Sequence, residues 1–203
     1  MQWRVSAETS CCAPINSDLM FQDRSVLSIE VDEEIQLSSV QDSYAPLYVD
    51  LAKENYDYLA KWLVWPPHTK TEEDFGDFIA RCKKDHESGA AITFGVIYSG
   101  KLIGNIAYKY INSELKKVEI GYWVAENYQG KGIISRACAR LVEYAFTNLG
   151  MVKVEMRVAS ENRPSRAVCE RLGMTLEGTI TNSEYVNGRV LDHAIYGLHR
   201  EKT

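Results

Sequence analysis

Long hydrophobic runs are missing from this chain of 203 residues, and no stretch approaches the ~20 apolar residues that a membrane-spanning helix needs. Residues 1–20 also lack the apolar stretch of about 7–15 residues that marks a secretory signal. We therefore expect neither a membrane partner nor an exported protein.

The cysteines include no C-x-x-C pair and are odd in number, being Cys11, Cys12, Cys82, Cys138 and Cys169. Such a set argues against a disulfide framework and a zinc site, and it favours a reducing compartment. The four histidines lie far apart, without H-E-x-x-H or similar ligand spacing. The sequence thus predicts a cytoplasmic protein without a bound metal.

An excess of positive charge is also absent, because 23 Lys and Arg residues face 28 Asp and Glu residues. The resulting net charge of −5 gives no general attraction to nucleic acid, and it suits a cationic substrate such as an amine. Apolar residues make up 45% of the chain and charged residues 25%, which is typical of globular proteins. The length fits one domain with a full hydrophobic core.

The hydrophobic pattern predicts an N-terminal extension over residues 1–25 and a single domain over residues 26–203. Helical spacing of apolar residues predicts helices over 41–63, from Thr71 onward, over 135–149 and over 164–172. Strands are expected over 26–31, 35–40, 90–98, 102–110, 118–124 and 152–158, and on both sides of the Asn187-Gly188 turn. The strand over 152–158 is expected to expose one face, which carries Lys153, Glu155 and Arg157. This order predicts an α/β or α+β domain with a mostly antiparallel sheet.

The most informative segment is the glycine turn, residues 129–135, which reads Q-G-K-G-I-I-S between a predicted strand and a predicted helix. A glycine-rich turn that opens a helix presents free backbone N–H groups and the positive end of the helix dipole, so it predicts a phosphate or pyrophosphate site. It is not a Walker P-loop, because Lys131 precedes Gly132. It matches the Rossmann fingerprint poorly, because Ser135 stands where the third glycine belongs. A plain helix start with two glycines stays open.

The string Q-G-K-G-I resembles the Q/R-x-x-G-x-G/A signature of the Gcn5-related N-acetyltransferase (GNAT) superfamily, with Ile134 in place of the last Gly or Ala. The segments E-I-G-Y-W-V (119–124), N-R-P-S-R-A-V (162–168), R-L-G-M-T-L-E-G (171–178) and N-x-x-x-L-x-x-W-L-x-W (55–65) resemble its RimJ/RimL branch. Enzymes of that branch acetylate the N-terminal amino groups of ribosomal proteins. The resemblance covers about residues 26–200 by its motifs.

The resemblance implies a GNAT fold, in which a mixed, mostly antiparallel, twisted sheet is flanked by helices and splayed at its central strands. It implies acetyl-CoA as acyl donor and no metal. The pyrophosphate is expected on the backbone N–H groups of the glycine turn, and the pantetheine amides on a strand edge. The implied coenzyme-binding residues are Tyr122, Trp123, Val124, Gln129, Gly130, Lys131, Gly132, Ile133, Ile134, Ser135 and Asn162.

The resemblance places a catalytic glutamate at Glu119, which is expected to act as general base, directly or through water. It places Ser165 opposite the coenzyme sulfur, as a donor to the departing thiolate. Alternatives stay open, because Glu119 can instead pair with Lys116 or Lys117 and Ser165 can simply cap a helix. Other donors to weigh are Tyr144, Tyr185 and Tyr196.

Direct transfer in a ternary complex is expected, because Cys138 and Cys169 fall on apolar helix faces with no base to activate them. The expected acceptor is a primary amine, with a protein N-terminus as the first hypothesis. A small amine, polyamine or amino sugar is the second, and a non-catalytic acyl-CoA-binding module is the third. Trp62, Trp65 and Tyr185 are candidate acceptor residues, although aromatic residues at helical spacing more often belong to a core. A homodimer stays open.

Overall fold

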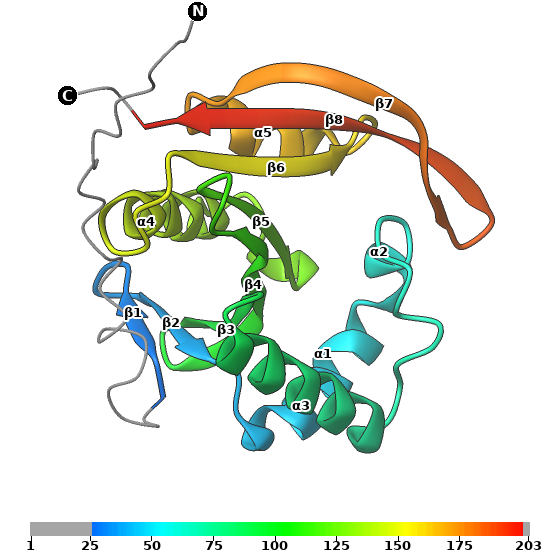
Figure 1. Cartoon of the computed structure of the whole chain (residues 1–203). Helices are drawn as coiled ribbons and strands as arrows, with labels where there is room; N and C mark the ends of the chain where they lie inside the picture. Colours follow the sequence, from blue (N-terminus) through cyan, green and yellow to red (C-terminus); the bar gives the residue numbers. More distant parts are fainter. Residues whose placement is uncertain (1–25, 201–203) are drawn as a thin grey trace, which may run out of the picture.

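The computed structural model describes residues 26–200, and the extension expected over residues 1–25 lies outside them. In the described part of the chain, eight strands form one sheet in the order β1-β2-β3-β4-β5-β6-β8-β7 (Figure 1). They are β1 (Ser28–Glu30), β2 (Ile35–Ser39), β3 (Ile92–Tyr98), β4 (Lys101–Asn112), β5 (Lys117–Val124), β6 (Lys153–Ala159), β7 (Thr175–Val186) and β8 (Arg189–His199). Among them only β5 and β6 pair in parallel, which confirms the mostly antiparallel prediction.

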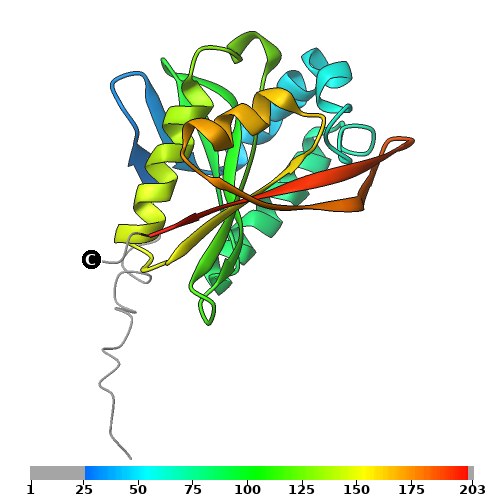
Figure 2. The ribbon, with the colours of Figure 1, turned by 90° about the horizontal axis from the view of Figure 1, so that it is seen from above.

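Helices cover both faces of the sheet (Figure 2). One face packs against α4 (Ile133–Thr147) and α5 (Arg163–Arg171). The other face, in the first half of the sheet, packs against α1 (Ala45–Glu54) and α3 (Glu72–Ser88), with the short α2 (Tyr56–Leu59) between them in sequence. Within residues 26–200 no helix combines the length and hydrophobicity needed to cross a membrane.

The sheet splays between β5 and β6. These strands pair only where residues 117–119 meet residues 153–155, although β5 continues to Val124 and β6 to Ala159. Over residues 120–124 the β6 side of β5 therefore carries no strand partner in the described structure. The splay confirms a feature that the family resemblance implied.

Several predicted elements are confirmed, including a capped start of α3. The Thr71 Oγ1 accepts from the Asp74 N–H at 3.1 Å, and the Asp74 carboxylate accepts from the Thr71 N–H at 2.9 Å. The Asn187-Gly188 turn also forms as expected, with φ of +47° and +91°. Turn and capping signals act locally, so the sequence alone reveals them.

The single helix predicted over residues 41–63 is wrong, because the segment breaks at Asn55 between α1 and α2. The Asn55 Nδ2 donates to the Leu51 carbonyl at 2.8 Å, and its Oδ1 accepts from the Glu126 N–H at 2.8 Å. The second bond spans 71 residues of sequence. A tertiary contact thus overrides local helix propensity.

The solvent-exposed face predicted for residues 152–158 is also wrong at Glu155, which is only 4% exposed. Its neighbours Lys153 and Arg157 do remain partly exposed, and both contact its carboxylate. Alternation along the sequence predicted that these three residues share one face of the strand. It did not predict that Lys153 and Arg157 would contact the Glu155 carboxylate, which is buried between them.

Candidate functional site

The glycine turn follows β5 and a short 3₁₀ turn, η3 (Glu126–Tyr128), and it opens α4. Gly130 and Gly132 both have φ of +71°, a left-handed conformation that favours glycine. Gly132 is the N-cap of α4 and contributes no side chain, so no side chain of that residue covers the first N–H groups of the helix. The turn therefore has the chemistry of an anion site.

Two neighbouring side chains support a coenzyme at this turn. The Gln129 Nε2 and the Tyr122 hydroxyl are buried and have no hydrogen-bond partner within residues 26–200. A buried polar group left unsatisfied costs about 1–3 kcal/mol, so a ligand with carbonyl and amide groups would relieve both. The Lys131 ammonium lies 5.0 Å from the centre of the Tyr128 ring, which holds a positive charge beside the turn.

The remaining residues of the glycine turn have structural contacts. Ile133 and Ile134 are buried in the core under the sheet, so only their backbone groups are available to an anion. The Ser135 hydroxyl accepts from Arg171 Nε at 3.2 Å. Trp123 and Val124 are buried as well, and their backbone lies on the splayed part of β5.

Ser165 lies in the first turn of α5, and it is not the N-cap. The cap is Asn162, whose Oδ1 accepts from the Ser165 N–H at 3.2 Å, so the capping alternative for Ser165 is wrong. Burial raises the pKa of the Tyr122 hydroxyl well above its ordinary value, and the nearby Ser165 side chain opposes this by a smaller amount. Ser165 and Tyr122 are therefore neighbours, and Tyr122 stays protonated at neutral pH. Its hydroxyl is a donor that the sequence analysis did not weigh.

The alternative tyrosine donors are differently placed. The Tyr196 hydroxyl accepts from Arg166 Nε at 3.0 Å and lies 3.4 Å from a Glu170 oxygen, so it is already engaged. Tyr144 packs on the hydrophobic core, where burial raises its pKa. Tyr185 is 68% exposed.

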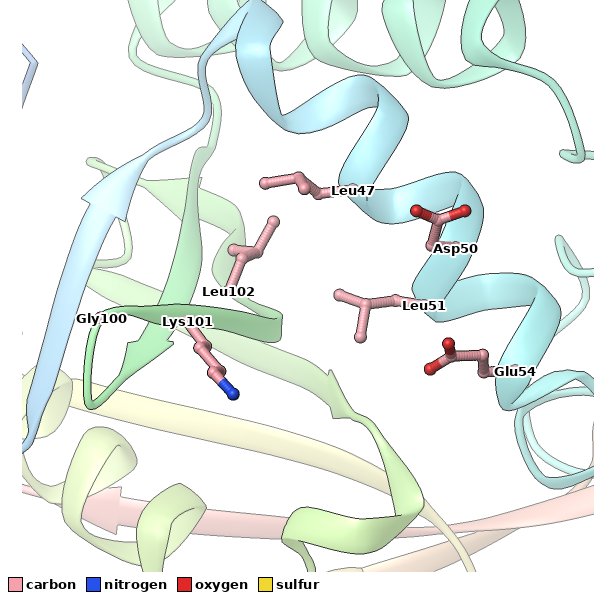
Figure 3. A pocket seen from close by; sticks show the side chains of 7 residues that line it. All are labelled: Leu47, Asp50, Leu51, Glu54, Gly100, Lys101 and Leu102. Atoms are coloured by element: carbon pink, nitrogen blue, oxygen red, sulfur yellow. The ribbon is translucent and has the colours of Figure 1, made fainter.

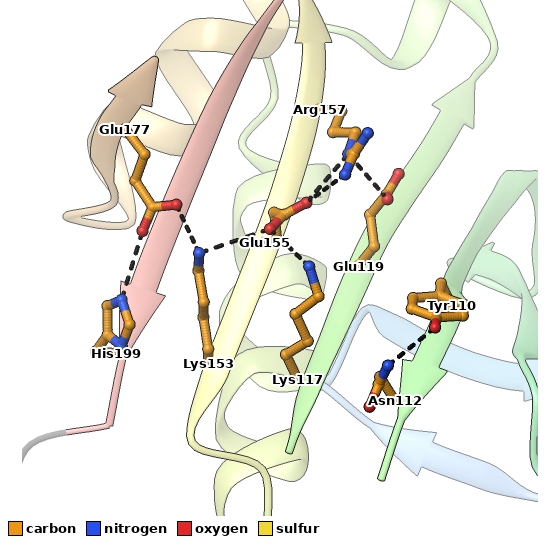
Figure 4. A network of polar contacts seen from close by, with 9 residues as sticks. All are labelled: Tyr110, Asn112, Lys117, Glu119, Lys153, Glu155, Arg157, Glu177 and His199. Carbon is orange, nitrogen blue, oxygen red and sulfur yellow. Dashed lines mark hydrogen bonds and ion pairs between the residues drawn. The ribbon is translucent and has the colours of Figure 1, made fainter. Parts of the chain in front are cut away.

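Glu119 lies at the last paired position of β5, where the splay begins. Its carboxylate contacts Arg157 Nε at 3.3 Å (Figure 4). It also contacts Lys109 Nζ at 3.4 Å, and the Glu119 side chain is 16% exposed. The ion pair weighed as an alternative role does form, but with Arg157 and Lys109 in place of Lys116 or Lys117, and Lys117 instead contacts Glu155 at 3.1 Å. Side chains alternate along a strand, so Glu119 and Tyr122 lie on opposite faces of β5.

The contacts of Glu119 extend into a network of charges across β5, β6 and β7 (Figure 4). Burial by itself would raise the pKa of Glu155, but hydrogen bonds from Lys117 and Arg157 hold that pKa below its ordinary value. Arg157 bridges Glu155 and Glu119 at 3.0 and 3.3 Å. The network therefore orients the Glu119 carboxylate through Arg157.

A second carboxylate, Glu184 on β7, was missed by the sequence analysis. Its Oε2 lies 3.3 Å from His193 Nε2. Glu184 pairs with Leu191 across the hairpin and shares a strand face with Val186, and both of these residues are buried against Trp62. The Asn187-Gly188 turn sets this register, so the turn was the signal that places Glu184 on the same face of the hairpin as Val186.

The three predicted acceptor residues do not come together. Trp62 packs under the β7–β8 hairpin with Val186 and Leu191. Trp65 lies in the core beneath α1 and α3, with its ring centre 5.6 Å from that of Trp123. Tyr185 is on the opposite face of the hairpin from Val186.

A hollow of about 360 Å³ lies elsewhere, between α1 and the β3–β4 turn (Figure 3). It is lined by Leu47, Asp50, Leu51, Glu54, Gly100, Lys101 and Leu102. None of the predicted site residues lines it, so we place the candidate site at the splay and not in this hollow.

Comparisons with known proteins agree with this geometry. A family model described as an acetyltransferase (GNAT) domain matches residues 35–175. The protein YdaF of Bacillus subtilis (strain 168) is 32% identical over 174 residues, which is 85% of this chain and 95% of that protein. The ribosomal-protein-serine acetyltransferase of Escherichia coli (strain K12) is 31% identical over 170 residues, or 83% and 94% of the two chains.

Solved structures extend the likeness to the whole fold. The microcin C7 self-immunity acetyltransferase MccE, in complex with acetyl-CoA and AMP, has a TM-score of 0.81 and 29% identity, covering 85% of this chain and 96% of that one. RimL, a ribosomal L7/L12 α-N-protein acetyltransferase in complex with coenzyme A, has a TM-score of 0.82 and 25% identity, covering 85% and 98%. The chain therefore belongs to the GNAT acetyltransferase family and is an acetyl-CoA-dependent N-acetyltransferase.

Proposed function

We propose that the enzyme transfers the acetyl group to a protein N-terminal amino group, by direct attack in a ternary complex. Relatives of similar length support a protein acceptor, since the Escherichia coli relative is a ribosomal-protein-serine acetyltransferase. The observation that carries the mechanism is the splay, which has Tyr122 and Ser165 on one side and Glu119 on the other. The thioester, entering from one face of the sheet, and the amine, entering from the other, meet between these residues.

On the donor side, acetyl-CoA supplies an activated thioester when it is bound. The first N–H groups of α4 and the Lys131 ammonium hold the pyrophosphate, and Gln129 adds a buried amide donor. The backbone of residues 122–124 binds the amides of the pantetheine arm as an added strand would. Asn162 keeps its Nδ2 for a coenzyme carbonyl, because only its Oδ1 caps α5.

On the acceptor side, Glu119 removes a proton from the incoming ammonium, directly or through a water molecule. An N-terminal ammonium has a pKa of about 7.7–8.0, so a carboxylate is a sufficient base at neutral pH. Arg157 and Lys109 hold the carboxylate in place. A backbone N–H near Tyr122 stabilises negative charge that develops on the carbonyl oxygen.

The departing thiolate accepts a hydrogen bond from Ser165, with Tyr122 as the second donor beside it. An acyl-enzyme is not part of this mechanism. Burial raises the pKa of the Cys138 thiol, and it raises that of Cys169 to about 12, so neither thiol ionises readily at neutral pH.

A thiol-release assay with acetyl-CoA tests the proposal on peptides with free N-termini, the same peptides with blocked N-termini, polyamines and amino sugars. We expect turnover of free but not of blocked peptides. Turnover of polyamines or amino sugars alone would replace the protein acceptor by a small amine. Absence of turnover across the whole panel would favour an acyl-CoA-binding module. Light scattering of the same sample checks for a homodimer.

A further inference from the structure

A lysine on β4, Lys109, lies at an irregular point of the sheet, directly opposite the proposed base. Tyr108 pairs with Ile120 of β5, and Tyr110 pairs with Glu119, so Lys109 is an extra residue without a partner of its own. Such a bulge sets two residues of one strand opposite a single residue of the next, and bulges are common beside active sites. The Lys109 ammonium lies 3.4 Å from the Glu119 carboxylate.

The stem of the Lys109 side chain lies against Gly121 of β5. A Cβ at position 121 would collide with the Cδ of Lys109, so glycine leaves room for the stem there. Gly121 directly precedes Tyr122, where the backbone that is proposed to bind the pantetheine arm begins. Lys109 is therefore adjacent both to the proposed base and to the start of the proposed coenzyme site.

The cations beside the proposed base are turned towards solvent, and the carboxylates are not. The Lys109 side chain is 60% exposed and that of Arg157 42%, whereas Glu119 is 16% and Glu155 6% exposed. Arg157 is held by both of these carboxylates, but among residues 26–200 Lys109 pairs with no carboxylate besides Glu119. A molecule that approaches Glu119 from solvent therefore meets a cation that is free to bind an anion.

The charges on this face of the sheet do not balance. The connected network contains four cations and three carboxylates, namely Lys109, Lys117, Lys153, Arg157, Glu119, Glu155 and Glu177. His199 also contacts Glu177 and would only add to the positive side if it were protonated. An acceptor ammonium brings a further positive charge to this face, which disfavours its approach. A negative charge on the acceptor, close to its amine, offsets this repulsion.

We propose that Lys109 selects acceptors that carry a carboxylate near the reacting amine, which in a protein means an acidic second or third residue. The inference rests on the proposed function, in which Glu119 receives the proton of the amine. An amine in contact with Glu119 and a carboxylate in contact with Lys109 are at most about 10 Å apart. Residues of an extended chain advance ~3.3–3.6 Å each, so this distance reaches the second or third residue.

The test uses two pairs of peptides, which differ only in Asp or Asn at the second residue or at the third. Exposed ion pairs are weak, so we expect the wild-type kcat/KM for the Asp peptide to exceed that for the Asn peptide by about two- to fivefold in at least one pair. Lys109→Gln brings this ratio close to one, and Lys109→Arg retains the preference. Added salt lowers the wild-type ratio and leaves that of Lys109→Gln unchanged.

The matched control is Lys101→Gln, which removes the same charge from the same strand, at the β3–β4 turn, where Lys101 is also exposed. Its Asp-to-Asn ratio stays at the wild-type value. Thermal melts check that each variant is folded. Calorimetric titration of the same peptides into the enzyme saturated with coenzyme A measures the preference without turnover, so a variant with a low kcat is tested as well.

A wild-type enzyme that does not favour Asp over Asn in either pair overturns the proposal. An equal fall in kcat/KM for both peptides of a pair in Lys109→Gln, with the ratio kept, overturns it too, because Lys109 then only positions Glu119. If the wild type acetylates small amines and no peptide, the protein acceptor fails, and the test pair becomes γ-aminobutyrate and its amide. Loss of the preference for γ-aminobutyrate in Lys109→Gln then supports the proposal, and an unchanged ratio overturns it.

Discussion

At the scale of single residues, the site is divided between the two faces of β5. Glu119 contacts Arg157 and Lys109 on one face, whereas Tyr122 lies beside Ser165 on the other. Strand alternation alone determines this division, and it separates the proposed base from the proposed donors. A substitution at Glu119 is therefore expected to affect removal of the proton from the amine. A substitution at Tyr122 or Ser165 is expected to affect departure of the thiolate.

Glu119→Gln lowers kcat by about 10²–10⁴-fold, as expected for a lost general base, and leaves the dissociation constant of acetyl-CoA unchanged. Arg157 keeps its contact with Glu155 in this variant, so the network stays largely paired. Steady-state kinetics and calorimetric titration measure the two effects. Glu184→Gln is the matched comparison and retains most of the activity. The reverse result would make Glu184 the base and Glu119 a structural ion-pair residue.

Tyr122→Phe leaves the free protein as stable as the wild type or more stable, because it removes a buried hydroxyl without a partner. The same change lowers kcat by about tenfold, since the departing thiolate loses a donor. Thermal melts without acetyl-CoA and steady-state kinetics measure both, with Ser165→Ala assayed alongside. A Tyr122→Phe variant that is less stable but fully active would contradict the assignment of Tyr122 as a donor to the thiolate.

At the scale of the elements, strands β5 and β6 are joined by side-chain charges as well as by backbone bonds, and Lys153 of β6 pairs with Glu177 of β7. Glu155 is the centre of this network and contacts Lys117, Lys153 and Arg157. A depressed carboxylate pKa stabilises the fold above the ordinary value of 4.5, and this stabilisation is lost as the pH falls through the lower folded value. The network is thus a source of acid sensitivity.

Glu155→Gln lowers the urea midpoint at pH 7, because three cations, Lys117, Lys153 and Arg157, lose the buried carboxylate that pairs with them. The difference from wild type shrinks as the pH falls from 4.5 through the lowered pKa of folded Glu155, since its carboxyl becomes protonated first in the unfolded and then in the folded wild type. Urea unfolding at several pH values measures this. Glu143→Gln, at an exposed carboxylate paired with Arg140, is the control and has little effect at any pH. A difference that is the same at every pH would mean that Glu155 acts by packing alone.

At the scale of the whole molecule, two halves of the sheet meet at three residue pairs, at the helices of the core and where Asn187 at the tip of the β7–β8 hairpin bonds residues 60 and 63. The coenzyme is proposed to lie between these halves. Binding of the coenzyme then connects the two halves of the sheet, because residues from both halves contact the same ligand.

Saturating acetyl-CoA slows hydrogen exchange at those backbone N–H groups of residues 120–124 that point away from β4, since these gain partners in the pantetheine arm. Exchange measured by mass spectrometry with and without acetyl-CoA checks this. Residues 104–106 of β4, which are already paired on both sides, are the internal reference. Protection limited to the glycine turn would contradict the proposed path of the arm.

The sequence by itself determined most of the elements, the glycine turn and the family. These depend on local physics, because caps, tight turns and hydrophobic periodicity act within a few residues, as at Thr71 and at Asn187-Gly188. Only the tertiary structure decided the break at Asn55, the burial of Glu155 and the contacts of Asn187 with residues 60–63. Each of these depends on partners far away in the chain, and the pattern of a single segment does not specify such partners.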